Sequence, residues 1–332
     1  VSATALGAVS VPGPIIWVVS SIASGMGTGT NIIAAQYVGA SKEDEVRSAA
    51  ATYVLFCGLL GIVLSVLCAL LSGPIVRSFL QTPTEMEWEA TVYLAVYSIG
   101  FFFQLLYQVF YGITRAFGDS KASLLFLLVA AILNLVLDLG FIILLDWGVV
   151  GAALASVIAQ AGSAVAALVY LIVRYPHISS AFRQLRLDRQ QLSLIARVSL
   201  PVTFQMVVQS AGFLLLQRMV NSFGPASIEG FAAMGKTEEL MHIHIICIST
   251  ALASFVGQNM GAQQIDRAER GVRFALYGML ILSVVLGGVM LLCDQHILQL
   301  FNITGESMLR GKEHMDIMCL LLPVFTVNRV LN

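Results

Sequence analysis

The chain has 332 residues, of which 58% are hydrophobic and only 11% are charged, and its mean hydropathy is +0.86. Soluble domains carry roughly 25% charged residues, so these values exclude an ordinary soluble protein and predict a membrane protein. The net charge of −1 says nothing about partners. The five cysteines lie in or beside apolar runs without metal or redox spacing, as is typical of small buried apolar residues.

Long apolar segments follow one another along the whole chain. A transmembrane helix needs about 20 mostly apolar residues. The first segment is long enough to be tilted or bent, and Pro12, Gly13 and Pro14 give a reason for a bend. In chain order, we expect spans at about 5–35, 49–72, 90–113, 122–145, 149–173, 198–220, 230–257, 272–293 and 313–331.

The longest polar stretch, 174–197, is rich in arginine and separates the fifth expected span from the sixth. It predicts a linker with a short amphipathic helix between two halves of the protein. The expected organisation is an N-terminal helical bundle at 1–178, a cytoplasmic linker at 179–197 and a C-terminal bundle at 198–332.

Lys and Arg residues gather on one side of the predicted membrane. If the loop at 36–48 is cytoplasmic and the loops alternate, the excess of positive charge lies inside, as the positive-inside rule requires. One missed span would invert half of this pattern, so it also supports the number of spans. The Lys and Arg residues left for the outside or the membrane are Arg77, Arg218, Lys236, Arg310 and Lys312.

An internal repeat relates the two halves. The segment Gln36–Ala40, QYVGA, reappears 222 residues later as Gln258–Ala262, QNMGA. Without a gap, the same offset pairs Ile75 with Ile297, Phe79 with Phe301 and Thr82 with Thr304. Both copies cross the membrane in the same direction, which predicts a parallel repeat about an axis along the membrane normal.

The repeat also leaves three spans without partners. The partner of 198–220 would precede Val1, and the partners of 122–145 and 149–173 would follow Asn332. We therefore expect the intact protein to have twelve spans in two six-helix bundles, with the first helix and the last two outside this chain.

Five motifs, in this order within a doubled helical pattern, resemble the multidrug and toxic compound extrusion (MATE) transporters, and their second-half spellings are closer to the bacterial branches. They are GMGTGTNIIAAQYVGA (25–40), YGITRAFGDSKAS (111–123), ILNLVLDLGFIILLDWGVVGAALASVIAQ (132–160), LPVTFQ (200–205) and FVGQNMGAQQIDRAERGVR (255–273). The resemblance implies the all-α MATE fold of two bundles, in the cell membrane. It also implies a multidrug antiporter that exchanges cationic or amphipathic substrates for Na⁺ or H⁺ by alternating access.

The most informative polar pair is Asn134 and Asp138, which share one helix face inside an apolar run. An aspartate near the centre of a span costs roughly 2.5–3.5 kcal/mol, so it normally faces a cavity or a partner. The resemblance implies that both belong to the cation or proton site of the first half, with Ser156 where threonine is usual. The alternative is that the pair only hydrogen-bonds neighbouring helices.

A second polar set is expected to line the substrate cavity: Lys236, Glu238, Glu239, Gln205 and Gln209. Glu238 and His242 stand four residues apart and can neutralise each other. The alternatives are an ion pair near the outer interface for the charged residues and interhelical hydrogen bonds for the glutamines, as also for Gln104 and Gln108.

Two rival functions stay open, a flippase for lipid-linked oligosaccharide precursors and a non-transporting membrane protein. A flippase that grips a pyrophosphate would need several cavity cations, whereas only Lys236 and Arg218 are available. The buried oxygen set argues against the second rival. An enzyme is not expected, because no phosphate loop, nucleophile elbow or metal cluster occurs. We expect no cofactor beyond the coupling ion, no nucleic-acid partner and a monomer in the lipid bilayer.

Overall fold

The computed structural model describes residues 8–80, 82–183, 185–221, 223, 225–300 and 305–331, and these residues form helices without strands. Nine helices of the described part are long and apolar enough to cross a membrane, which confirms the all-α, multi-span prediction. They are Ala8–Gly39, Glu43–Leu70, Thr84–Ala116, Lys121–Leu144, Gly148–Arg174, Arg189–Phe213, Thr237–Gly261, Ile265–Asp294 and Gly305–Leu331.

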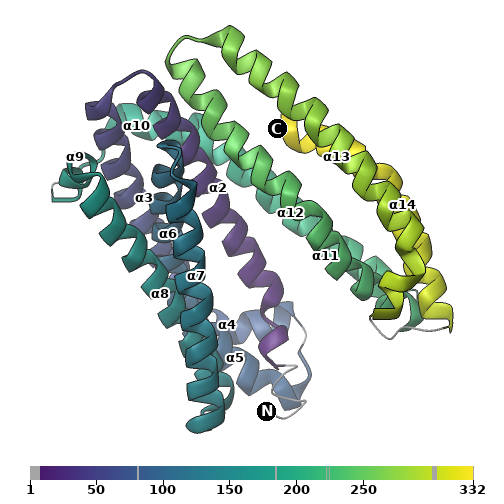
Figure 1. Ribbon diagram of the computed structural model, residues 1–332. Helices are drawn as coiled ribbons and strands as arrows, with labels where there is room; N and C mark the ends of the chain where they lie inside the picture. Colours follow the sequence, from purple (N-terminus) through teal and green to yellow (C-terminus); the bar gives the residue numbers. More distant parts are fainter. Residues whose placement is uncertain are drawn as a thin grey trace. The chain divides into compact units, whose positions relative to one another are not determined.

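The helical elements are shown in Figure 1. In the first part of the chain they are α2 (Gly13–Gly39), α3 (Glu43–Leu70), α4 (Ser72–Pro74), η1 (Ile75–Phe79), α5 (Thr84–Ser98), α6 (Gly100–Ala116), α7 (Ser120–Asp138), η2 (Leu139–Leu144), α8 (Gly148–Arg174), α9 (Pro176–Ser179) and η3 (Ser180–Arg183). The later elements are α10 (Arg189–Leu194), η4 (Ile195–Ser199), α11 (Leu200–Asn221), α12 (Pro225–Gly261), α13 (Ile265–Leu300) and α14 (Gly305–Leu331).

The chain divides into two compact units, Val1–Ala211 and Gly212–Asn332, with the boundary inside α11. The sixth span begins earlier than the expected residue 198, because α10, η4 and α11 form one helical run from Arg189. The carboxylate of Asp188 starts this run by accepting hydrogen bonds from the amides of Gln190 (2.7 Å) and Gln191 (3.4 Å). The arginines of this segment lower its hydropathy, which hides the helix start from a search for apolar runs.

In the first unit, α2 and α6 pack together with very little space between their backbones. A Cβ atom on Gly112 would stand 2.5 Å from the carbonyl oxygen of Gly27, so only glycine fits there. Amide groups on α6 hydrogen-bond hydroxyls on α2, Gln104 to Ser20 at 2.9 Å and Gln108 to Ser24 at 3.1 Å. Small residues and interhelical amide bonds are the devices by which membrane helices associate.

The turn between α6 and α7 combines a glycine with a helix cap. Gly118 has a φ of 79°, a backbone conformation that glycine adopts without a Cβ clash. Asp119 then caps α7, because its carboxylate accepts a hydrogen bond from the amide of Ala122 at 3.2 Å. The hydroxyl of Tyr170 on α8 donates to the same carboxylate at 2.5 Å and so fastens α8 to this turn.

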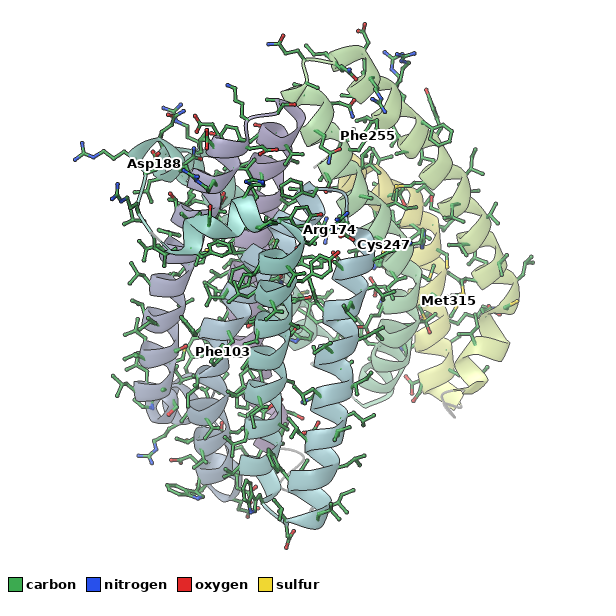
Figure 2. The ribbon with its side chains drawn as sticks, turned by 60° about the vertical axis from the view of Figure 1, so that its left-hand side comes forward. Phe103, Arg174, Asp188, Cys247, Phe255 and Met315 are labelled. Carbon is green, nitrogen blue, oxygen red and sulfur yellow. The ribbon has the colours of Figure 1, made fainter. Side chains whose placement is uncertain are left out.

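The second unit contains α12, α13 and α14 packed against one another. Its buried core is rich in methionine, whose flexible side chain fills irregular gaps between helices. Met315 on α14 lies among these helices in Figure 2. The fully buried or nearly buried methionines of this core are Met234, Met241, Met279 and Met315.

Candidate cation and substrate site

Asp138 stands at a change of helix type. It is the last residue of α7, and a π-helical segment, η2, follows directly at Leu139. A π-turn inserts an extra residue into the helical repeat and occurs frequently at functional sites. Asn134 lies one turn before Asp138, and both side chains are half-buried. The pair therefore lies in the last turn of a regular α-helix, directly before a π-helical turn.

The neighbouring helix brings in the third predicted residue. α8 packs against α7 and η2, and the half-buried Ser156 lies on its N-terminal half. Both the Ser156 hydroxyl and the Asp138 carboxylate lie within interaction range of the phenol of Tyr93 on α5. The structure therefore places Ser156 beside Tyr93 and puts Asp138 close enough to interact with the same phenol electrostatically, with Asn134 a helical turn away on α7.

Tyr93 is the residue that sequence reasoning missed. It is 7% exposed and lies on α5, which packs against α8. The ring of Tyr97, one turn later, stands 5.6 Å from that of Tyr93, and its hydroxyl faces Gln160 of α8. The sequence does contain a signal for this residue: two tyrosines stand four residues apart in an apolar span. Buried phenols require polar partners, so such a pair indicates a polar site.

The group offers one carboxylate, one amide oxygen and two hydroxyl oxygens. All of these are hard ligands, which suit a proton or a cation such as Na⁺. Among the described residues, no three His, Cys, Asp or Glu side chains come together in a way that could hold a metal ion. A cation bound here would therefore depend on a single carboxylate and neutral oxygens.

The polar cluster of the second unit surrounds the middle of α12. Glu238 is half-buried, and its carboxylate stands 3.9 Å from Nδ1 of His242. The ring of His242 stacks on Phe325 of α14, with the ring centres 4.2 Å apart. Glu239 is exposed, and the side chain of Lys236 lies outside the described residues. Glu238 therefore lies beside a histidine that contacts α14, whereas Glu239 lies on an exposed part of α12.

Gln205 and Gln209 are exposed on α11. The opposite face of this helix packs on α2, where the Ser210 hydroxyl hydrogen-bonds Ser21 and Thr203 contacts Gly25. Residues two and six positions after Thr203 lie on the far side of a helix with 3.6 residues per turn. The two glutamines therefore lie away from the helix face that packs on α2, unlike Gln104 and Gln108, which hydrogen-bond α2.

Comparison with known proteins identifies the family of the chain. The model of the MatE family matches residues 1–139 and 201–332, which is most of the chain. The chain belongs to the MatE family. Members of this family are transporters, so the protein is a multi-pass membrane transporter and not an enzyme.

Relatives of known sequence support the same conclusion. The probable multidrug resistance protein YoeA of Bacillus subtilis is 26% identical over 315 residues, which cover 92% of this chain and 67% of that protein. The probable multidrug resistance protein YpnP of the same organism is 27% identical over 331 residues, covering 99% of this chain and 74% of the relative.

A solved structure shares the fold. An outward-facing conformation of a multidrug resistance MATE family transporter superposes with a TM-score of 0.91 over 99% of this chain and 74% of that structure, at 22% identity. This likeness confirms the predicted MATE fold for the MatE chain. The roles of Asn134, Asp138 and Ser156 depend on the geometry described above.

Proposed function

We propose that this MatE protein is a multidrug efflux antiporter that expels cationic or amphipathic compounds in exchange for Na⁺ or H⁺. We further propose that it works by alternating access, as a monomer. Family membership and the relatives named multidrug resistance proteins support the direction and substrate class. The half-buried Asp138, grouped with Ser156 and Tyr93 beside a π-turn, carries the proposal of ion coupling.

The coupling step follows from the cost of a carboxylate in an apolar span. Asp138 lowers that cost by binding a proton or a metal cation, and Asn134, Ser156 and Tyr93 add neutral oxygens around the bound ion. Release of the ion restores the unfavourable free carboxylate. Occupancy therefore biases the inward-open and outward-open forms whenever they differ in ion affinity.

Substrate binding is assigned to the second polar set. In the second unit, Glu238 and Glu239 attract cationic compounds. In the first unit, Gln205 and Gln209 offer hydrogen bonds to a substrate. Lys236 repels excess positive charge and so limits the net charge of the compound. The exposure of Gln205 and Gln209 supports this assignment, because a substrate needs polar groups that it can reach.

The test is export of a fluorescent cationic dye from cells that express the protein with its natural termini. We expect Asp138→Asn to be made and inserted at the normal level and to lose gradient-dependent export. The substitution keeps size and hydrogen bonding but removes the charge. Uptake of the dye into everted vesicles, whose cytoplasmic face is outward, under an imposed Na⁺ or pH gradient identifies the coupling ion.

Asp146→Asn is the matched control. Asp146 is exposed and follows η2, and its φ of 52° is one that asparagine tolerates. The control should export dye at the wild-type rate. If Asp138→Asn exports dye at that rate with the same gradient dependence, Asp138 only joins helices and the coupling proposal is wrong.

A further inference from the structure

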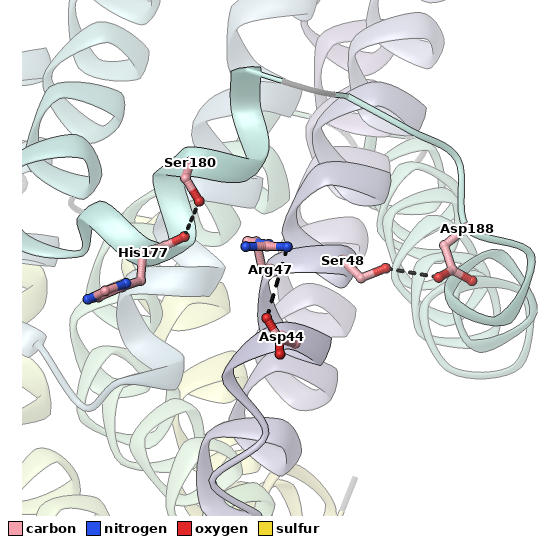
Figure 3. A network of polar contacts seen from close by, with 6 residues as sticks. All are labelled: Asp44, Arg47, Ser48, His177, Ser180 and Asp188. Atoms are coloured by element: carbon pink, nitrogen blue, oxygen red, sulfur yellow. Dashed lines mark hydrogen bonds and ion pairs between the residues drawn. The ribbon is translucent and has the colours of Figure 1, made fainter.

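A surface pocket of about 550 Å³ lies away from the cation site, between the N-terminal part of α3 and the segment before α10. Figure 3 shows Arg47 and Asp44 between the segment that carries His177 and Ser180 and the segment that carries Asp188. The residues that line the pocket include Asp44, Arg47, Ser48, Arg186, Leu187 and Asp188.

The pocket is held open by hydrogen bonds between its two walls. The Ser48 hydroxyl donates to Asp188 at 3.0 Å, and the Thr52 hydroxyl donates to the backbone carbonyl of Arg186 at 3.4 Å. The amide of Asp188 donates to Thr52 at 3.2 Å. Because these bonds join the two walls without a ligand, the pocket exists before anything binds. They use the backbone of Arg186, so its exposed guanidinium remains available to a ligand.

Two arginines and two aspartates line the pocket, but not all four are available to bind a ligand. The Asp188 carboxylate already accepts hydrogen bonds from two backbone amides and from Ser48. Arg47 is 53% exposed and stands 4.0 Å from Asp44, which is 94% exposed. An exposed pair at this distance is weak and is easily rearranged by a ligand. Two guanidinium groups and one carboxylate therefore remain available, which fits a zwitterion whose anionic part is a phosphate.

The pocket lies where lipid headgroups lie. Candidate spans end at Arg174 and begin at Glu43 and Arg189, so residues 44–51, 180–183 and 185–188 lie at or beside span ends, where the membrane–water interface is expected. The exposed side chains of Leu185 and Leu187 flank Arg186, as in interfacial segments that bury leucine among acyl chains. The positive-inside rule places the loop before α3 on the cytoplasmic side. Basic pockets between spans on the cytoplasmic side of a membrane are a common place for phospholipid headgroups.

We propose that this pocket binds the phosphoethanolamine headgroup of a membrane phospholipid. Arg47 and Arg186 bind the phosphate, and Asp44 binds the primary ammonium group. The acyl chains run beside Leu185 and Leu187 into the bilayer. The bound lipid joins the start of α3 to the segment that leads into α10 and α11.

Native mass spectrometry of the detergent-purified protein tests this assignment. The titrants are phosphatidylethanolamine, phosphatidylcholine, phosphatidylglycerol and soluble O-phosphoethanolamine. We expect tighter binding of phosphatidylethanolamine than of phosphatidylcholine, whose quaternary ammonium donates no hydrogen bond. Arg47→Gln/Arg186→Gln should bind phosphatidylethanolamine roughly 30-fold more weakly, since each basic residue at a membrane surface is worth about 1 kcal/mol. Asp44→Asn should weaken it by roughly 3-fold and leave phosphatidylglycerol unchanged or tighter.

The control is Arg267→Gln/Arg270→Gln, which removes two exposed arginines from the first turns of α13, the repeat partner of α3. It should bind lipid like the wild type. Equal affinity of the Arg47/Arg186 variant and this control would overturn the site. Preference for phosphatidylglycerol, or displacement of the lipid by equimolar O-phosphoethanolamine, would overturn the lipid assigned to it. Because the substituted side chains are exposed, an unchanged melting temperature separates lost binding from lost folding.

Discussion

The two copies of the internal repeat share a turn almost atom for atom. In the first copy, the amides of Ala40, Ser41 and Lys42 bond the carbonyls of Gln36, Val38 and Tyr37 at 3.0, 3.0 and 2.9 Å. In the second copy, each of these bonds recurs 222 residues later, at 3.0, 3.1 and 2.8 Å. Ser41 and Gln263 have φ values of 57° and 58°. The repeat thus preserves backbone geometry even where the side chains differ.

The helices that enter these turns differ in how closely they are packed. α2 carries Gly25, Gly27 and Gly29, and a Cβ on Gly29 would stand 2.0 Å from the Ser199 hydroxyl. The corresponding positions on α12 hold Cys247, Ser249 and Ala251, which all carry a Cβ. Glycines let the α2 backbone approach α6 and η4. A repeated turn therefore joins helices with different neighbours and different tolerance of added volume.

The helices that leave the turns differ in the same way. α3 presents Ser48 and Thr52 to the segment around Asp188, and its Tyr53 hydroxyl hydrogen-bonds Ser199 at 2.5 Å. The matching positions on α13 are Arg270 and Phe274, both exposed. The segment between the halves is therefore fastened to the first copy through residues that the second copy lacks.

The largest expected effect is on the glycine contacts of α2. Gly112→Ala would place a Cβ 2.5 Å from the backbone carbonyl of Gly27, and we expect about 3 kcal/mol of destabilisation from overpacking. Gly278→Ala on α13 meets open space and should stabilise its helix by up to about 1 kcal/mol. Unfolding in detergent, followed by tryptophan fluorescence, measures both. Equal effects of the two substitutions would contradict the close packing of α2 on α6.

A smaller effect is expected at the segment fastened to α3. Asp188→Ala removes a helix cap and a hydrogen bond from Ser48 and should cost about 1–2 kcal/mol of stability. Asp266→Ala, in the first turn of α13, should cost under about 0.5 kcal/mol, as expected for an exposed surface position. A loss at Asp266 as large as that at Asp188 would contradict the asymmetry.

Asp188 also predicts a pH dependence. The backbone amide of Gln190, the Ser48 hydroxyl and the amide of Gln191 hold the pKa of this carboxyl below its ordinary value of 3.8. Because the folded-state pKa is the lower one, the stabilisation is complete above pH 3.8 and is lost as pH falls below it. Acid unfolding of wild type and Asp188→Ala should therefore converge below pH 3.8. A constant difference between them across that range would show that the charge of Asp188 is irrelevant.

The smallest effect concerns the turns themselves. Ser41→Gly and Gln263→Gly should each stabilise the protein by about 0.5 kcal/mol, since relief of the positive φ slightly exceeds the added entropy of the unfolded chain. Ala40→Gly, at a φ of −79°, should instead destabilise it. Melting temperatures of the three variants measure this. Opposite signs at Ser41 and Gln263 would show that the two turns are not energetically equivalent.

Much of the fold follows from the sequence because the relevant signals are local. Apolar length predicts the spans, since each must cross the same hydrocarbon thickness. The matching of Gln36–Ala40 with Gln258–Ala262 predicts the shared turn, because backbone hydrogen bonds within a turn depend on nearby residues. The start of the sixth span at Arg189 was missed, because a helix cap followed by arginines looks like a polar linker to any measure of hydropathy.

The candidate site divides along the same line. Asn134 and Asp138 are recognisable from their spacing in one apolar helix, and family resemblance adds Ser156. Tyr93 lies on α5, which α6 separates from Asn134 and Asp138 along the chain, so only the packing of α5 and α7 on α8 brings it within electrostatic range of the Asp138 carboxylate. Likewise, the sequence suggests that four glutamines could bridge helices or face a cavity. In the tertiary structure, Gln104 and Gln108 hydrogen-bond α2, whereas Gln205 and Gln209 are exposed. Helix periodicity can be read from the sequence, but the residue that a side chain contacts on another helix depends on how whole helices pack.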